Sequence, residues 1–250
     1  MVVFPNCKIN LGLFVTHKRQ DGYHHLESIF LPVDFYDALE IVPNGTNECV
    51  VHTYNSAIEI PLLSHSCFQA WSLLKRDFDI EGVDIHLIKH TPSGAGLGGG
   101  SSDAAFALQV LNDIFSLGLA KEDLVRYCAL LGSDQAFFIY NQPCYLSGSG
   151  PEIEPFSFHQ NFKISLSFPN VHISTKEAFS RLDPRPMEFE LRELSLIPKS
   201  DWKDILRNDF QKGAVQAHPI IQYHIDQMYD HGAFYSAMSG SGSAVFGLFD

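Results

Sequence analysis

The chain has 250 residues, a formal net charge of −12, 45% hydrophobic residues and 18% charged residues. These values are ordinary for a soluble globular protein that is long enough for one large or two small domains. The negative charge disfavours nucleic acid and anionic membranes as partners, because their phosphates would be repelled. A phosphate-bearing ligand must therefore be held locally, by backbone amides, a few lysines or a metal ion.

The cysteines are odd in number, widely spread and without a C-x-x-C pair: Cys7, Cys49, Cys67, Cys128 and Cys144. This pattern indicates reduced thiols rather than a disulfide framework or a zinc site. The first residues lack the basic and apolar regions of a signal peptide, and no apolar run approaches the roughly 18 residues that span a bilayer. We therefore expect a cytoplasmic protein, and no protein partner is evident.

Near the start, residues 7–15 alternate as a strand does, which places Lys8 and Asn10 on one face. A lysine and an amide that point together can grip phosphate or hydroxyl oxygens, but a solvated polar face has the same pattern. The hairpin signal Asp21-Gly22 then sets Tyr23 and His24 at a loop edge, where both rings can meet a planar ligand.

Residues 64–78 predict a helix with His65 near its start, and residues 83–89 predict a strand that ends at Lys89. After that strand, residues 92–105 hold five glycines and open into an apolar-periodic helix that Ser101 or Ser102 can cap. Asp103 suits the positive end of that helix. A glycine loop before a helix N-terminus presents free N–H groups and predicts a phosphate site.

Two common phosphate loops are excluded or disfavoured. A Walker A loop needs a lysine after its last glycine, but Gly100 is followed by Ser101-Ser102. A Rossmann unit matches by letter at Gly94, Gly96 and Gly99, yet the chain continues after Phe115 into another helix instead of the required second strand.

Residues 121–131 predict a helix that Gly132 ends, and Asp134 follows in an apolar neighbourhood, where it can serve as a cap or as a chemical group. The run 148–150 predicts a domain boundary, with domains at 1–150 and 151–250. Further on, residues 162–168 predict a strand, Ser174 or Thr175 caps a short helix, and the run 237–246 holds a glycine turn between strands.

The loop resembles the phosphate loop of the GHMP kinases through Pro92, Gly96-Leu97-Gly98, Ser101-Ser102 and Ala104-Ala105. The resemblance implies an α/β (α+β) fold with two domains, in which mixed sheets carry helices on one face. It also implies ATP and Mg²⁺ as cofactors, with Ser101 or Ser102 as a candidate metal ligand. The implied nucleotide-binding residues are Lys89, Pro92, Ser93, Gly94, Ala95, Gly96, Leu97, Gly98, Gly99, Gly100, Ser101 and Ser102. Lys89 can equally be an ordinary strand-end lysine.

Other blocks are similar to the GHMP kinases whose substrate carries a cytidine diphosphate: residues 8–11, the run Asp21–His24 followed by Asp34 and Asp37, and the Leu-Gly-x-Asp-x-x-Phe-Phe run around Asp134. The resemblance makes Asp134 the general base, with Lys8 as its electrostatic partner and Asn10 as an orienting group. The implied cytidine contacts are Tyr23, His24, Thr175 and Phe179. Where relatives hold adenine with an asparagine, this chain has His65.

The implied reaction is ATP-dependent phosphorylation of the 2-hydroxyl of a methylerythritol moiety, in the non-mevalonate isoprenoid route. Three other functions stay open at this point: a GHMP kinase for another small alcohol, a catalytically inactive cytidine-nucleotide-binding relative, and a nucleotide-dependent oxidoreductase. The segment 183–199 is proline-rich and short, and there the resemblance is weakest.

Overall fold

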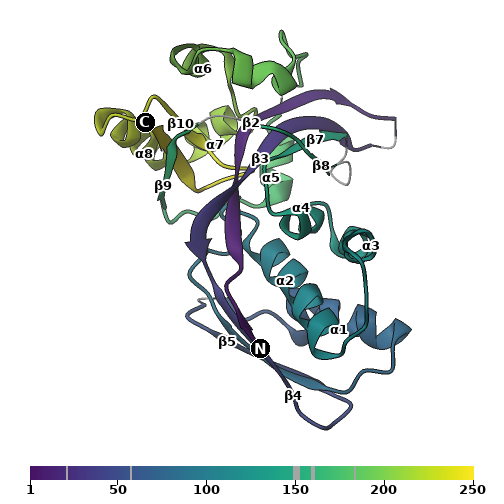
Figure 1. Cartoon of the computed structure of the whole chain (residues 1–250). Helices are drawn as coiled ribbons and strands as arrows, with labels where there is room; N and C mark the ends of the chain where they lie inside the picture. The colour runs from purple at the N-terminus through teal and green to yellow at the C-terminus, as the bar shows by residue number, and fades with distance from the viewer. Residues whose placement is uncertain (21, 57, 149–152, 159–160, 183) are drawn as a thin grey trace. The chain divides into compact units, whose positions relative to one another are not determined.

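The computed structural model describes residues 1–250 except 21, 57, 149–152, 159–160 and 183. The chain divides into two compact units, and each is interleaved in sequence (Figure 1). Unit 1 comprises Met1–Cys7, Asp34–Ser93 and Gly98–Gln142, and unit 2 comprises Lys8–Val33, Gly94–Leu97 and Pro143–Asp250. The predicted boundary at residue 150 stays a prediction, because it lies outside the described residues.

Unit 1 contains a four-stranded sheet in the order β1-β4-β6-β5. β4 pairs antiparallel with β1 and β6, whereas β5 runs parallel to β6, so the sheet is mixed as predicted. Alternate residues of β4 and β6, such as Leu39, Ile41 and Ile85, are fully buried, which is the pattern of a sheet covered on one face. Its strands are β1 (Val2–Val3), β4 (Ala38–Pro43), β5 (Cys49–Tyr54) and β6 (Val83–Ile88).

Two helices of unit 1 cover this sheet: α1 and α2 lie side by side, α1 against β5 and α2 against β4 (Figure 1). The apolar side of α2, with Ala104, Leu108 and Leu111, has no exposed surface. That burial explains the helical spacing of these residues in the sequence. The helices of this unit are η1 (Leu62–Ser64), α1 (Ser66–Asp77), α2 (Gly99–Ile114), α3 (Lys121–Leu131) and α4 (Gln135–Tyr140).

The start of α2 corrects one expectation. The N-cap residue is Gly98, with a left-handed φ of 71°, and neither serine caps the helix. Ser101 and Ser102 lie instead in its first turn, because the chain enters the helix through a backbone conformation that favours glycine. After α2 the chain passes directly to α3, so residues 99–131 contain no second strand and the Rossmann interpretation is excluded.

Unit 2 contains two sheets, in the orders β2-β3-β7-β8 and β10-β11-β9. The strands are β2 (Asn6–Lys18), β3 (His24–Tyr36), β7 (Cys144–Gly148), β8 (Ile153–Pro155), β9 (Lys163–Ser167), β10 (Tyr235–Met238) and β11 (Val245–Phe249). β2 and β3 are long strands whose first or last residues belong to unit 1. The helices are α5 (Thr175–Ser180), η2 (Leu191–Leu196), η3 (Lys199–Asp201), α6 (Trp202–Ile205), α7 (Gln211–Ala217) and α8 (Ile220–Asp230).

The core of unit 2 joins β2 to the C-terminal half of the chain. Leu13 and Val15 pack in one cluster with α8 residues such as Ile221 and Ile225 and with Val245 of β11. α8 lies against β10 and β11, at the end of the chain marked C (Figure 1). The first strand predicted from the sequence therefore shares a core with the C-terminal part of the chain.

Two further features concern the cysteines and the length of the helices. All five cysteines are buried, reduced thiols. Among the residues that the structure describes, no helix has the length and apolarity to cross a membrane.

Candidate functional site

The part of the glycine loop that belongs to unit 2, residues 94–97, is held by backbone hydrogen bonds from two sides. The Lys8 N–H donates to the Leu97 carbonyl oxygen at 3.0 Å, and the Ala244 N–H donates to the Ala95 carbonyl oxygen at 3.0 Å. β2 therefore supports the loop on one side, and the C-terminal glycine turn supports it on the other side. The two supports come from near opposite ends of the chain, at Lys8 and Ala244.

Gly96 shows how close this approach is. Its φ is +77°, and a Cβ atom there would lie 2.0 Å from the Ser239 carbonyl oxygen. The Ser239 hydroxyl donates to the Gly96 carbonyl oxygen at 2.9 Å and accepts from the Asn10 N–H at 3.3 Å. Both the positive φ and the contact require glycine at this position.

The polar pair of β2 continues this network. The buried Lys8 ammonium donates to Asn10 Oδ1 at 2.5 Å and lies 4.4 Å from the centroid of the Phe30 ring. Asn10 Nδ2 donates to the Ser28 hydroxyl at 3.0 Å, which donates in turn to the Gly12 carbonyl oxygen. The prediction that Lys8 and Asn10 share a face is confirmed, and the face is buried rather than solvated.

The residues predicted to contact cytidine lie at the β2–β3 hairpin and on α5, within unit 2. The His24 and Phe179 rings are 5.2 Å apart, and Phe179 packs edge-on against Phe210 at 5.0 Å. Burial, together with the nearby Lys18 charge, lowers the pKa of His24, which favours the neutral imidazole. Tyr23 is 68% exposed. Thr175 begins α5 after the capping residue Ser174, and its side chain is outside the described part.

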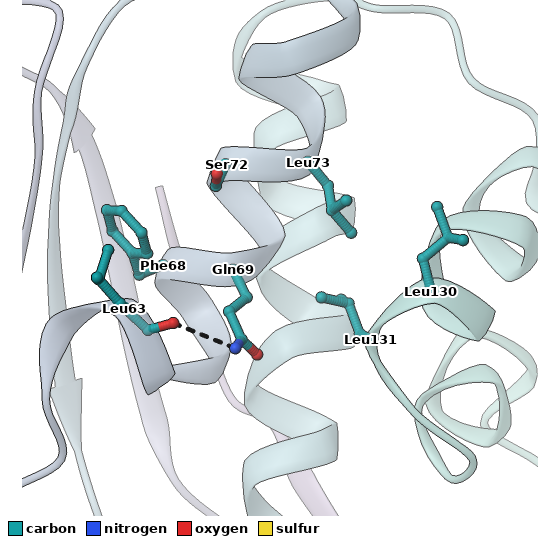
Figure 2. A pocket seen from close by; sticks show the side chains of 7 residues that line it. All are labelled: Leu63, Phe68, Gln69, Ser72, Leu73, Leu130 and Leu131. Atoms are coloured by element: carbon teal, nitrogen blue, oxygen red, sulfur yellow. Dashed lines mark hydrogen bonds between the residues drawn. The ribbon is translucent and has the colours of Figure 1, made fainter.

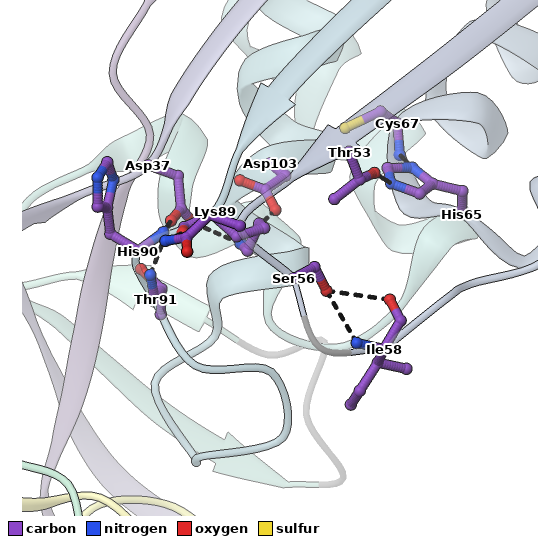
Figure 3. A network of polar contacts seen from close by, with 11 residues as sticks. Asp37, Thr53, Ser56, Ile58, His65, Cys67, Lys89, His90, Thr91 and Asp103 are labelled. Atoms are coloured by element: carbon purple, nitrogen blue, oxygen red, sulfur yellow. Dashed lines mark hydrogen bonds and ion pairs between the residues drawn. The ribbon is translucent and has the colours of Figure 1, made fainter.

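In unit 1, the end of β6 carries a buried cluster of charges (Figure 3). The Lys89 ammonium forms ion pairs with Asp37 Oδ2 and, at 2.7 Å, with Asp103 Oδ2. Asp37 Oδ1 also accepts from the N–H groups of His90 and Thr91, at 2.5 and 2.8 Å. Lys89 is therefore neither a free strand-end lysine nor an ammonium that points into solvent.

Asp103 differs from its expected role. It was expected in the first turn of α2, where the helix dipole favours an acid, but that turn holds no acidic residue. Asp103 lies just beyond it, is 2% exposed and is paired with Lys89. Burial raises the pKa of Asp103 to about 7, against the opposing effect of Lys89 and with a smaller contribution from Asp37. One sequence feature could have indicated this burial: Asp103 directly precedes the apolar run Ala104-Ala105, and a helix dipole does not account for a carboxylate among apolar neighbours.

Unsatisfied polar atoms gather around the loop. Among the described residues, the buried side-chain atoms without a hydrogen-bond partner are Thr91 Oγ1, Ser102 Oγ, Asp103 Oδ1 and Gln135 Oε1. Three of these four flank the glycine loop in sequence. Buried polar groups are nearly always paired, so such a concentration is typical of a site that a ligand completes.

The His65 side chain caps the start of α1. It is the N-cap of α1: its Nδ1 accepts from the Cys67 N–H at 3.3 Å, and its Nε2 lies 3.1 Å from the Thr53 hydroxyl (Figure 3). Because Nδ1 accepts, the ring is neutral with its proton on Nε2. Burial, and then the Lys89 charge, lowers the pKa of His65 in agreement with this.

Asp134 is the N-cap residue of α4, but its side chain makes no capping hydrogen bond. Ser133 Oγ donates to Asp134 Oδ1 at 3.0 Å, and the carboxylate is only partly buried. The capping interpretation of this residue is therefore wrong for its side chain.

A separate groove of about 370 Å³ was not anticipated from the sequence (Figure 2). It lies between α1 and the end of α3, with Gln69 as its main polar group, bonded to the Leu63 carbonyl oxygen. Leu63 and Leu130 are 76% and 63% exposed. None of the predicted site residues lines it.

Comparison with known proteins covers the whole chain. The model described as GHMP kinases N terminal domain matches residues 65–142, and the model described as GHMP kinases C terminal matches residues 194–250. The 4-diphosphocytidyl-2-C-methyl-D-erythritol kinase of Bacteroides fragilis is 45% identical over all of this chain and 92% of its own length. The protein of the same name from Chlorobium limicola is 38% identical over 98% of this chain and 86% of its own.

Solved structures of GHMP kinases also superimpose on this chain. A crystal structure of 4-(cytidine 5'-diphospho)-2C-methyl-D-erythritol kinase superimposes with a TM-score of 0.82 at 29% identity, covering 99% of this chain and 90% of that one. Homoserine kinase from Cytophaga hutchinsonii has a TM-score of 0.74 at 16% identity, covering 99% of this chain and 84% of its own. The second match concerns the fold alone.

The cap at His65 gives a prediction for the pH dependence of stability. The folded state holds a neutral imidazole, whereas in the unfolded chain the imidazole has its ordinary pKa of about 6.5. Unfolding therefore takes up a proton below about pH 6.5, and stability is lost as the pH falls through that value. His65→Asn, which keeps a good N-cap, should remove this part of the loss, and His65→Ala should cost about 1 kcal/mol at pH 8.

Urea unfolding of the three proteins at pH 5.5 and pH 8 measures these differences. Other titrating groups, Asp103 included, are common to all three and cancel in the comparison. An equal loss between the two pH values in wild type and His65→Asn would contradict the neutral cap.

Proposed function

The chain belongs to the GHMP kinase family, in the branch of the 4-diphosphocytidyl-2-C-methyl-D-erythritol kinases, and we propose how its residues divide the reaction. It is an ATP-dependent kinase of isoprenoid synthesis. The proposed reaction transfers the γ-phosphate of ATP to the 2-hydroxyl of the methylerythritol moiety, in the non-mevalonate route. The cytidine diphosphate part of the substrate serves as the handle for recognition.

One observation carries the assignment of the site. β2 presents the buried Lys8 ammonium and Asn10 amide from the same stretch of backbone that hydrogen-bonds to Leu97 of the loop. A cation and an amide beside a glycine loop are what phosphoryl transfer requires, because the protein mainly positions reactants and offsets charge. This supports Lys8 as the group that offsets negative charge at the acceptor oxygen, with Asn10 holding its ammonium.

The loop and the start of α2 would bind the ATP phosphates. Gly98 leads into a helix of 16 residues, whose first N–H groups have no partner within the helix. Gly99 packs so closely that a Cβ atom there would lie 2.8 Å from Thr91 Cγ2. The absence of side chains at these positions lets phosphate oxygens approach the amides.

The fit of Mg²⁺ rests on hydroxyl groups and on the nucleotide. In the part of the chain that the structure describes, no group of three or more His, Cys, Asp or Glu residues can hold a metal ion. Mg²⁺ usually binds through one or two protein ligands plus substrate phosphates and water. The buried, unpartnered Ser102 hydroxyl and the half-buried Ser101 hydroxyl suit that mode, and the ion would neutralise charge on the phosphates.

Asp134 is the proposed general base, which removes the proton from the attacking hydroxyl. Its carboxylate is partly exposed and does not cap α4, and the Leu-Gly-x-Asp-x-x-Phe-Phe run around it supports this role by resemblance to the family. Lys8 and Asp134 belong to different units, so each assignment is supported by its own surroundings and by the family resemblance.

The hairpin and α5 form the proposed cytidine site. Tyr23 and Phe179 would enclose the base, and the neutral His24 imidazole can both donate to and accept from its edge. Thr175 would add a contact from the start of α5. A polar aromatic site of this kind distinguishes a cytidine-bearing substrate from a simple alcohol.

The acceptor can be tested directly. A coupled assay for ADP release should show turnover with the cytidyl substrate and about a thousandfold lower kcat/KM with mevalonate, homoserine or galactose, since a base-binding site contributes several kcal/mol. Comparable rates with one of the simple alcohols would mean that the chain is a different GHMP kinase.

Asp134→Asn should lower kcat by about 10² to 10⁴, the usual contribution of a positioned general base. The affinity for ATP should stay unchanged, because the substitution keeps the size of the side chain. Asp113→Asn, at an exposed position on α2, is the control for loss of one carboxylate. A kcat within threefold of wild type for Asp134→Asn would refute the assignment.

Tyr23→Ala should raise KM for the cytidyl substrate by about 10- to 100-fold, as expected from loss of one base-stacking contact. KM for ATP should not change, and Tyr23→Phe should behave like wild type. Tyr223→Ala, which removes another exposed tyrosine, serves as the matched control. Equal effects on both substrates would place Tyr23 outside the cytidine site.

A further inference from the structure

Asp37, which directly precedes β4, makes an unusual set of contacts for a residue outside the predicted site. It is 1% exposed, and its Oδ1 accepts from two consecutive backbone N–H groups, those of His90 and Thr91. These are the last two residues before Pro92, where the glycine loop begins. Its other oxygen, Oδ2, pairs with the Lys89 ammonium.

The same lysine reaches the other end of the loop. Lys89 Nζ donates to Asp103 Oδ2 at 2.7 Å, and Asp103 directly follows Ser102, the last residue of the proposed nucleotide-binding segment 92–102. Gly99 packs over this contact, since a Cβ atom there would lie 3.3 Å from Lys89 Nζ. The chain Thr91–Asp37–Lys89–Asp103 thus connects the residue that precedes the loop to the residue that follows it (Figure 3).

We propose that Asp37 is a positioning residue for the nucleotide loop: through Lys89 and Asp103 it fixes the two ends of the loop relative to each other. The proposal rests on the proposed binding of ATP at residues 92–102. It reassigns Lys89 from a nucleotide contact to a member of this brace, by which we mean Asp37, Lys89 and Asp103.

The physical reason lies in the charges. One ammonium is shared by two carboxylates, all three groups are buried, and the Lys89 carbonyl oxygen accepts from Asn55 Nδ2 at 2.6 Å. A lysine held in this way has little freedom to follow a ligand. Instead, Lys89 can keep the loop amides in the geometry that phosphates require. Phosphate binding then does not have to pay for ordering the loop.

Asp37→Asn distinguishes a Lys89 that contacts the nucleotide from a Lys89 that belongs to the brace. The asparagine oxygen can still accept from the two backbone N–H groups, but the link to Lys89 is lost. Lys89 and Asp103 then remain as a pair of opposite charge, so no buried charge is left alone and the protein should fold. If Lys89 contacted the nucleotide, this variant would free its charge and ATP would bind at least as tightly as before.

The brace predicts the opposite result. Asp37→Asn should raise KM for ATP and the Kd for MgADP on the order of tenfold, as expected for loss of a buried charged hydrogen bond that orders a loop. KM for the cytidyl substrate should stay within twofold of wild type. Asp37→Ala, which also removes the acceptor for the two amides, should weaken nucleotide binding further.

Asp34→Asn is the matched control, because Asp34 is exposed on the same stretch and bonds to Tyr36 rather than to the loop. Unchanged or tighter nucleotide binding in Asp37→Asn overturns the proposal. Equal losses for both substrates, or a loss of binding that follows the fraction unfolded in urea, would reduce Asp37 to a structural role and also overturn it. MgADP binding needs no acceptor, so failure of the proposed reaction is distinguishable from failure of the brace.

Discussion

The pairing of Lys89 with Asp37 and Asp103 is the interaction on which the organisation of unit 1 around the loop depends. Burying an ion costs several kcal/mol, and the cost is recovered only where charges and hydrogen bonds match. Here the match needs the end of β6, the residue before β4 and Asp103, just beyond the first turn of α2, to meet. The requirement selects one arrangement of strand, loop and helix, which hydrophobic packing of α2 on the sheet would leave less defined.

The loop itself has few means of holding its shape. Gly96 and Gly98 adopt positive φ angles that most residues avoid, and glycines have the largest conformational entropy to lose. Its order therefore comes from outside: in unit 2 from β2 and the Ser239–Ala244 turn, in unit 1 from the charged brace. In a chain of net charge −12, backbone amides are a way to present positive electrostatic potential without adding further cations.

Local patterns in the sequence predicted much of the fold. The helix at residues 121–131 was predicted to the residue, the strand before the loop to within one residue, and the face shared by Lys8 and Asn10 was correct. These features depend on periodicity and on turn residues, which act over a few positions. The cap of α2 was wrong because serine at a helix start is a good cap in general, whereas this helix begins in a left-handed conformation at Gly98.

The sequence by itself determined the class of protein: a glycine loop before a helix, with the blocks around Lys8, Tyr23 and Asp134, is similar to the kinases that the full-length comparisons then identified. Only the tertiary structure decided which side chains support the loop. Asp37 and Asp103 lie 52 and 14 residues from Lys89 along the chain, and Ser239 lies 143 residues from Gly96. Contacts over such separations leave no local period, because they arise from burial of charge and close backbone approach after the sheets and helices have packed.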